Sequence, residues 1–227
     1  MIDEESELHA LRVALAAARR REAVLAADLL AARQELQHRV RNTLAIVRSI
    51  ARRSAESVET VEDYQQHLDG RLAALGRVQA ALVRAPGLGV DLGSLITDEL
   101  STVGSLPIGT IELSGPEIRL KAKPAELIGL AVHELATNAV KFGALAAAAG
   151  RIAIGWSLDR QGGAPGILIA WREQCDVPLV AAGRRGFGTE LLENAIAYEL
   201  SGTTSLDYRR EGLACQIRLP LDCRMSA

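Results

Sequence analysis

The chain of 227 residues is poor in aromatic side chains: two Trp, three Tyr and two Phe make up only 3% of it. This scarcity argues against a platform on which the bases of a single-stranded nucleic acid stack. The formal net charge is only −2, so no strong positive field attracts DNA or an anionic membrane surface. We therefore expect no nucleic-acid partner.

Cysteines are also few. The three present, Cys175, Cys215 and Cys223, lack the spacing of metal ligands and are odd in number, which indicates free thiols in a reducing compartment. No stretch approaches the ~18 consecutive apolar residues that span a bilayer. The acidic N-terminus lacks the basic region of a signal peptide. We expect a cytoplasmic protein with no membrane span.

Glycine and proline are absent from residues 1–69. Apolar or Ala residues recur there in steps of three and four between Leu8 and Leu36, and this seam continues to Ile50. The pattern predicts a long helix of a coiled coil or helical bundle. A second amphipathic helix is predicted to begin at the N-cap Thr60. Because each helix exposes an apolar stripe, we expect a homodimer in which two hairpins form a four-helix bundle.

A turn cluster at Ala85–Gly89 predicts a domain boundary. Beyond it, helices are expected at 92–100, from Pro124 to about Gly143, and in a segment ending near Gly202. The expected strands alternate with these helices and lie at 111–113, 118–121, 151–158, 166–172, 204–209 and 213–219. The fold class is therefore α+β: a helical hairpin followed by an α/β sandwich with a mixed sheet.

His38 is the first candidate for chemistry. At about 100° per residue, it lies opposite the apolar seam, on the polar face that also carries Gln34, Arg41 and Asn42. A solvated imidazole titrates near neutrality and can act as a nucleophile. A surface histidine without a role would give the same pattern, and periodicity alone favours that simpler interpretation.

A second candidate site lies on the predicted helix that begins at Pro124. Steps of four and three place Glu134, Asn138 and Lys141 on one face of it. A carboxylate, an amide oxygen and a cation on one face suit a magnesium–triphosphate site. A solvated, charged helix face is an equally good interpretation of the spacing alone.

Two further segments are weaker signals. The loop Gly183–Thr189 contains three glycines and two arginines directly before a predicted helix, an arrangement that lets backbone N–H groups approach phosphate oxygens but also suits a simple turn. Trp171-Arg-Glu173 ends a predicted strand. Its carboxylate could accept a hydrogen bond from an adenine amino group, or form a strand-terminal charge pair.

The order of these segments is more specific than any one of them. Residues 35–45 (ELQHRVRNTLA) resemble the phosphoacceptor box of the HWE-type sensor histidine kinases of two-component systems. Residues 133–145 resemble that family's N box, Trp171-Arg-Glu173 its Trp-x-Glu element and residues 186–192 its glycine box. The resemblance spans roughly residues 35–221.

The resemblance implies two modules, and the apolar seam before them adds an N-terminal segment. Residues 1–36 would be an N-terminal coiled-coil or signalling helix, residues 37–86 a dimerisation and histidine-phosphotransfer hairpin, and residues 87–227 a catalytic ATP-binding domain of the Bergerat (GHKL) type. A sensor partner would bind at the N-terminal helix.

The resemblance also implies residue roles. His38 would accept the γ-phosphoryl group of ATP, Glu134 would activate or orient the site, Asn138 would coordinate Mg²⁺ and Lys141 would contact phosphates. Glu173 would replace the adenine-reading aspartate of other histidine kinases. The glycine box would close over the triphosphate through Gly186, Gly188 and Thr189.

The expected function is that of an ATP-dependent protein histidine kinase, with ATP and Mg²⁺ as cofactors, that passes its phosphoryl group to an aspartate of a response-regulator receiver domain.

One departure from the family stands at residues 174–178, where Gln-Cys-Asp-Val-Pro replaces a glycine-rich turn. This departure supports one alternative, a histidine phosphotransferase that no longer binds ATP. The other alternative is a nucleotide-switched dimerisation scaffold.

Overall fold

The computed structural model describes residues 2–56, 60–104, 109–146, 149–159, 164–175, 187–209 and 211–225. The chain divides into two units, Met1–Ser49 and Ile50–Ala227. The first unit consists of most of one long helix, and the second contains a sheet with its covering helices.

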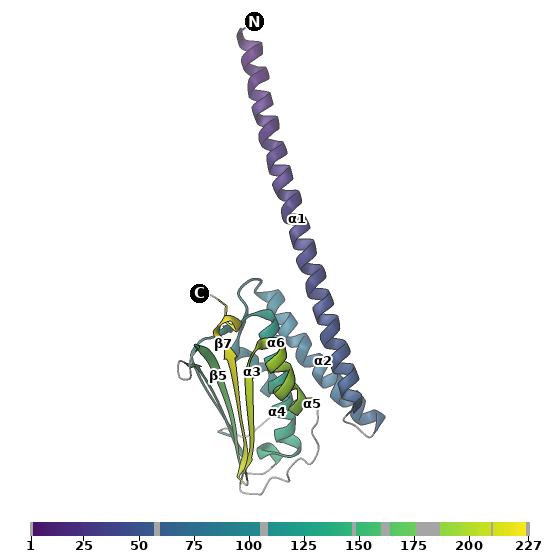
Figure 1. Ribbon diagram of the computed structural model, residues 1–227, viewed down its shortest axis with the longest axis vertical. Helices are drawn as coiled ribbons and strands as arrows, with labels where there is room; N and C mark the ends of the chain where they lie inside the picture. The colour runs from purple at the N-terminus through teal and green to yellow at the C-terminus, as the bar shows by residue number, and fades with distance from the viewer. Residues whose placement is uncertain are drawn as a thin grey trace. The chain divides into compact units, whose positions relative to one another are not determined.

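Helix α1 spans Ile2–Glu56 without interruption (Figure 1), as the lack of glycine and proline predicts. In the first unit its apolar seam is open to solvent: Leu11 is 62% exposed and Leu29 is 72% exposed. A lone helix cannot bury such a stripe against itself. The seam is therefore an apolar surface without a cover within the described residues of this unit.

The second unit contains a mixed five-stranded sheet in the order β2-β4-β5-β7-β6. Strand β2 runs parallel to β4, and the other neighbours are antiparallel. The two strands β1 and β3 form a small separate sheet. The strands are β1 Val90–Asp91, β2 Ile111–Ser114, β3 Arg119–Leu120, β4 Arg151–Asp159, β5 Gly166–Gln174, β6 Thr203–Arg209 and β7 Gly212–Pro220.

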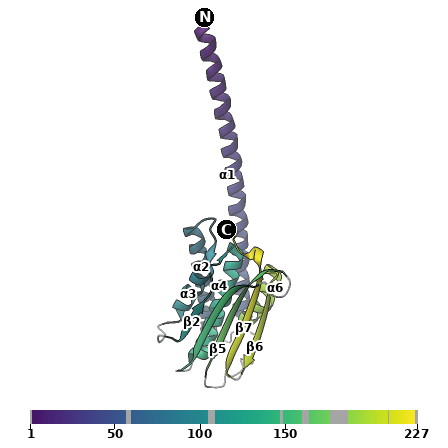
Figure 2. The same ribbon diagram turned by 90° about the vertical axis from the view of Figure 1, so that its left-hand side faces the viewer.

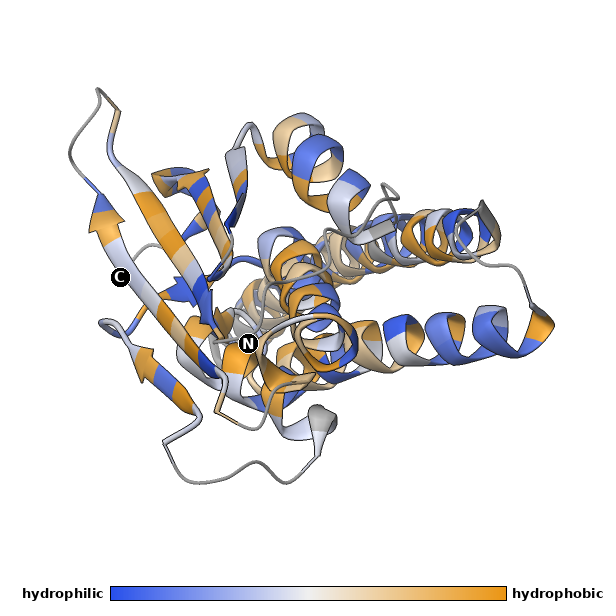
Figure 3. Ribbon diagram, turned by 90° about the horizontal axis from the view of Figure 1, so that it is seen from below, coloured by the Kyte–Doolittle hydropathy of each residue, from blue (hydrophilic) through white to orange (hydrophobic). Residues whose placement is uncertain are grey.

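Helices cover one face of this sheet, as Figures 1 and 2 show. Alternate residues of each strand face them, and the buried side chains of β7 include Leu213, Ile217 and Leu219. Apolar and polar residues accordingly alternate along the strands in Figure 3. The α+β class with a helical N-terminus is confirmed. The covering helices are α3 Leu92–Leu100, α4 Ala122–Lys141, α5 Phe187–Glu190 and α6 Ile196–Leu200, with a π-helical turn at Leu191–Ala195.

Helix α2 (Val61–Arg84) lies against α4 and α3 as a further layer. Its N-cap is the predicted one, since the N–H of Asp63 donates to Thr60 Oγ1 at 3.1 Å. Glycine permits the close packing of the two helices: a Cβ added to Gly70 would lie 2.9 Å from His133 Nε2, and one added to Gly129 would lie 2.8 Å from Val78 Cγ2. The second predicted helix therefore packs directly on the helix that carries the N box.

The functional boundaries at 36/37 and 86/87 stay a prediction, because structural units and functional modules need not coincide. The first unit ends at Ser49, and α2 belongs to the same unit as the sheet. Among the described residues, no helix combines the length and hydropathy that a bilayer crossing needs.

The close packing of α2 on α4 predicts opposite outcomes for two glycines of α2. Gly76→Ala should raise the free energy of unfolding by about 0.5–1 kcal/mol, the usual gain for a helical glycine, because a Cβ at Gly76 meets nothing within 4 Å. Gly70→Ala should lower it, because the new methyl would press on His133. Urea denaturation of both variants tests this, and an equal gain in both would contradict the described packing.

Candidate active site

Most of the predicted site residues gather around the C-terminal half of α4. Glu134, Asn138 and Lys141 follow one another along this helix, where Glu134 is buried and the other two are exposed. Glu173 lies beyond the end of α4, beside Ala144. The structure thus brings the N box and the Trp-x-Glu element together.

Glu134 is held by an arginine of α2. Arg71 Nε donates to Glu134 Oε1 at 2.8 Å, and Arg71 Nη2 donates to Oε2 at 3.1 Å. The third arm of the guanidinium, Nη1, donates to Ser54 Oγ at 2.6 Å. All three residues are buried. This two-pronged pairing is the strongest geometry available to a guanidinium and a carboxylate.

Lys141 also contacts α2. Its Nζ lies 2.8 Å from His67 Nε2. Because an ammonium group only donates, the imidazole nitrogen accepts and the ring is neutral. Burial, and then the positive charges of Lys141 and Arg71, lower the pKa of His67 from 6.5. His67 is therefore a half-buried partner of the N box, although no pattern in the sequence assigns it a role.

The glycine box reaches the same place on α4. A Cβ added to Gly188 would lie 3.0 Å from Glu134 Cβ and 3.1 Å from Glu134 Oε2, so the backbone of α5 covers this carboxylate closely. Thr189 is half-buried in the same short helix. Gly186 and most of the altered turn at 174–178 lie outside the described residues.

Both carboxylate oxygens of Glu173 are engaged. Trp171 Nε1 donates to Oε1 at 3.0 Å, and the N–H of Ala144 donates to Oε2 at 2.8 Å. Burial raises the pKa of Glu173, and the two hydrogen bonds oppose that rise without cancelling it. Glu173 thereby fixes the turn that follows α4.

His133, the first residue of the N-box motif, belongs to a separate cluster. Its Nδ1 lies 3.4 Å from Glu99 Oε2, and Arg77 Nε donates to Glu99 Oε1 at 2.9 Å. Burial raises the pKa of Glu99, but the contacts with His133 and Arg77 together outweigh burial and lower it. His133 therefore helps to join α4 to α3.

His38 lies in the first unit and is exposed on α1. Its Nδ1 is 3.3 Å from Asn42 Nδ2, one helical turn later. The expectation of a solvated imidazole on the polar face of this helix agrees with this placement.

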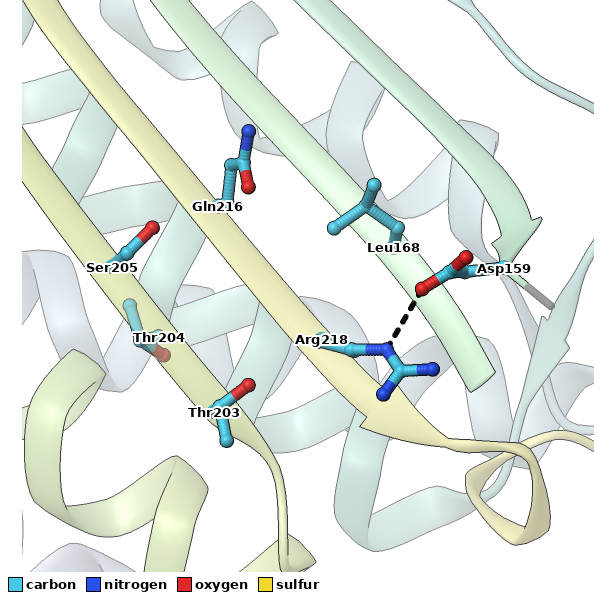
Figure 4. Close-up of a pocket in the computed structure, with 7 residues that line it drawn as sticks. All are labelled: Asp159, Leu168, Thr203, Thr204, Ser205, Gln216 and Arg218. Atoms are coloured by element: carbon cyan, nitrogen blue, oxygen red, sulfur yellow. Dashed lines mark hydrogen bonds and ion pairs between the residues drawn. The ribbon is translucent and has the colours of Figure 1, made fainter. Parts of the chain in front are cut away.

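Two hollows lie away from these residues. One, of about 330 Å³, is on the sheet face opposite the helices, where Arg218 reaches across β5 to Asp159 at 2.8 Å (Figure 4). The other surrounds Trp156 near the start of α3. Neither hollow includes a residue predicted for the nucleotide site.

The sequence did not point to Arg71, Ser54 or His67. A signal existed for Arg71, because it stands four and seven residues before Leu75 and Val78, on the buried face of α2. A charged residue on such a face requires a buried partner of opposite charge. The sequence has several carboxylates that could fill this role, so the partner could not be chosen from the pattern.

Comparisons with known proteins concern the family and the fold of the chain. The sequence model of the HWE histidine kinase family matches residues 35–117. The resemblance to the HWE histidine kinases is confirmed. A blue-light-activated histidine kinase of Brucella abortus is 29% identical over 188 residues, which cover 83% of this chain and 38% of that protein. One from Brucella anthropi is 28% identical over 195 residues, covering 86% of this chain and 40% of that protein. The chain thus spans well under half the length of these curated relatives.

Solved histidine kinase structures share the fold. The blue-light activated histidine kinase EL346 of Erythrobacter litoralis superposes with a TM-score of 0.58 at 19% identity, covering 82% of this chain and 58% of that one. The histidine kinase domain of the same protein gives a TM-score of 0.52 at 16% identity, covering 78% of this chain and 95% of that domain. At these identities the likeness concerns the fold alone.

The lowered pKa of His67 predicts a pH dependence of stability. Because the folded pKa lies below 6.5, the unfolded chain takes up the proton first, and stability falls as pH drops through 6.5. The loss is at most about 1.4 kcal/mol per pH unit for one proton. His67→Gln, which keeps an acceptor for Lys141, should flatten this decline in urea titrations between pH 7.5 and 5.5. His9→Gln on α1 is the control, and an unchanged slope in His67→Gln would refute the prediction.

Proposed function

We propose that this chain is an ATP-dependent protein histidine kinase that phosphorylates itself on His38 and passes the phosphoryl group to an aspartate of a response-regulator receiver domain. One observation carries the proposal: Glu134, Asn138 and Lys141 lie on the C-terminal half of α4, and Glu173 lies just beyond its end, in a chain that resembles the HWE histidine kinases. The alternative interpretation, a solvated and charged helix face, does not explain why the glycine box lies beside these residues.

The residues present fit a magnesium–nucleotide complex. The exposed amide of Asn138 offers a neutral oxygen of the kind that Mg²⁺ binds, and the exposed Lys141 ammonium offsets phosphate charge. Gly188, which lacks a side chain, keeps the backbone close to α4. Glu173 retains lone pairs for an adenine amino group beside its two hydrogen bonds. Bound ATP supplies the activated γ-phosphoryl group.

His38 is the proposed nucleophile. Its imidazole nitrogen forms a bond to the γ-phosphorus while the bond from that phosphorus to the bridging oxygen breaks, and ADP leaves. Phosphoryl transfer depends on positioning and charge neutralisation more than on covalent work by the protein. A receiver-domain carboxylate then attacks the phosphohistidine and frees the imidazole.

Labelling from γ-labelled ATP and Mg²⁺ tests the acceptor. The wild type should acquire an acid-labile, alkali-stable label, and His38→Ala should remove it because no imidazole remains at the acceptor position. His9→Ala, another exposed histidine of α1, is the matched control and should retain the label. Undiminished label in His38→Ala would rule out the assignment.

A second candidate function is phosphotransfer without ATP. It is favoured by the altered turn at 174–178 and by the contacts of α2 with Glu134 and Lys141. The two candidates differ in nucleotide binding. Calorimetry with a non-hydrolysable ATP analogue and Mg²⁺ distinguishes them, since the kinase should bind it and Asn138→Ala should weaken that binding.

We also propose that the exposed seam of α1 binds a second copy of this chain. A contiguous apolar stripe in water usually marks an interface, and a two-fold pair closes it. Light scattering at micromolar concentration should give about twice the monomer mass of 24.2 kDa. Leu29→Glu, in the middle of the seam, should return the mass to that of the monomer. A monomeric wild type would contradict the dimer. The exposed seam of the N-terminal helix would then be available to a sensor partner.

A further inference from the structure

The Glu134 carboxylate is closed on two sides. Arg71 donates to both of its oxygens, and a Cβ added to Gly188 would lie only 3.1 Å from Oε2. Glu134 is only 8% exposed. A carboxylate that acts as a general base must lie within hydrogen-bond reach of the water whose proton it takes. The two Arg71 donors therefore compete with any water molecule for the oxygens of this carboxylate.

The pair of Arg71 and Glu134 differs in its position from the other buried pairs that α2 forms. Glu99 and Glu126 take their partners from α2 as well, through Arg77 and Gln79. Only Glu134 among them stands one turn before Asn138 and beside the glycine box. Under the proposed function, it is the one of these three carboxylates that lies beside the residues for Mg²⁺ and phosphate.

We propose that Arg71 is a positioning residue that decides which acceptor receives the phosphoryl group. It holds Glu134 away from water, so that the imidazole of His38 is phosphorylated and ATP is not hydrolysed. In the suppressed reaction, a water oxygen would bond to the γ-phosphorus, ADP would leave, and Glu134 would take the water proton. The inference rests on the proposed function, because it assumes that ATP binds beside α4.

The contact with Ser54 adds a link to the phosphoacceptor helix. Ser54 stands near the end of α1, the helix that carries His38, and accepts from Arg71 Nη1 at 2.6 Å. The guanidinium is therefore fixed by groups from α1 and α4 at once. A lysine could not make these three directed bonds, so the position requires an arginine.

The test measures phosphate release and phosphohistidine from Mg²⁺–ATP in the same samples. Arg71→Gln should raise the ratio of released phosphate to phosphohistidine about ten-fold or more, since a general base accelerates such steps by about 10²–10⁴-fold. Arg71→Gln combined with Glu134→Gln should lose the gained phosphate release. The matched control is Arg77→Gln, which breaks a similar pair at Glu99 and should leave the ratio unchanged.

Each outcome decides the proposal. A gain in phosphate release that depends on Glu134 and comes at the expense of phosphohistidine supports it. A wild type that forms no phosphohistidine overturns the proposed function, and this inference with it. An unchanged ratio, a proportional loss of both products, or an equal gain in Arg77→Gln overturns it. If circular dichroism shows that Arg71→Gln is unfolded, Arg71→Lys replaces it. This variant keeps the positive charge inside the fold, and the same criteria apply.

Discussion

The buried pair of Arg71 and Glu134 is the interaction on which the arrangement of the second unit depends. Removing one partner of such a pair leaves an uncompensated buried charge, at a cost of about 3–5 kcal/mol. The same helix satisfies two more buried carboxylates, since Arg77 pairs with Glu99 and Gln79 donates to Glu126. Helix α2 is therefore as much a part of the layer that covers the sheet as α3 and α4 are.

This dependence connects the chemistry of the site to the helices before it. The N-box residue Glu134 is held by α2, and Lys141 shares a short contact with His67 of the same helix. Any movement of α2 along α4 changes the partners of both residues at once. Through these contacts α2 is coupled to the two residues of α4 that we propose to act on the nucleotide.

Much of the fold could be predicted from the sequence because its elements have strong local signals. The N-cap Thr60, the alternation in β7 and the absence of helix breakers in α1 each fix an element without help from distant residues. The partners of buried charges could not be predicted in this way. Arg71 meets Glu134 across 63 positions, and Lys141 meets His67 across 74 positions. The engaged oxygens of Glu173 were hidden for the same reason, because Ala144 precedes it by 29 positions.

The most direct test of the account is a double-mutant cycle on the pair itself. Arg71→Met and Glu134→Leu are made singly and together, and the free energy of unfolding is measured in urea for the four proteins. The account predicts that each single change is strongly destabilising and that the double variant recovers part of the loss, with a coupling energy above about 1 kcal/mol. Losses that simply add, to within about 0.5 kcal/mol, would show that α2 is not joined to the N-box helix through these side chains.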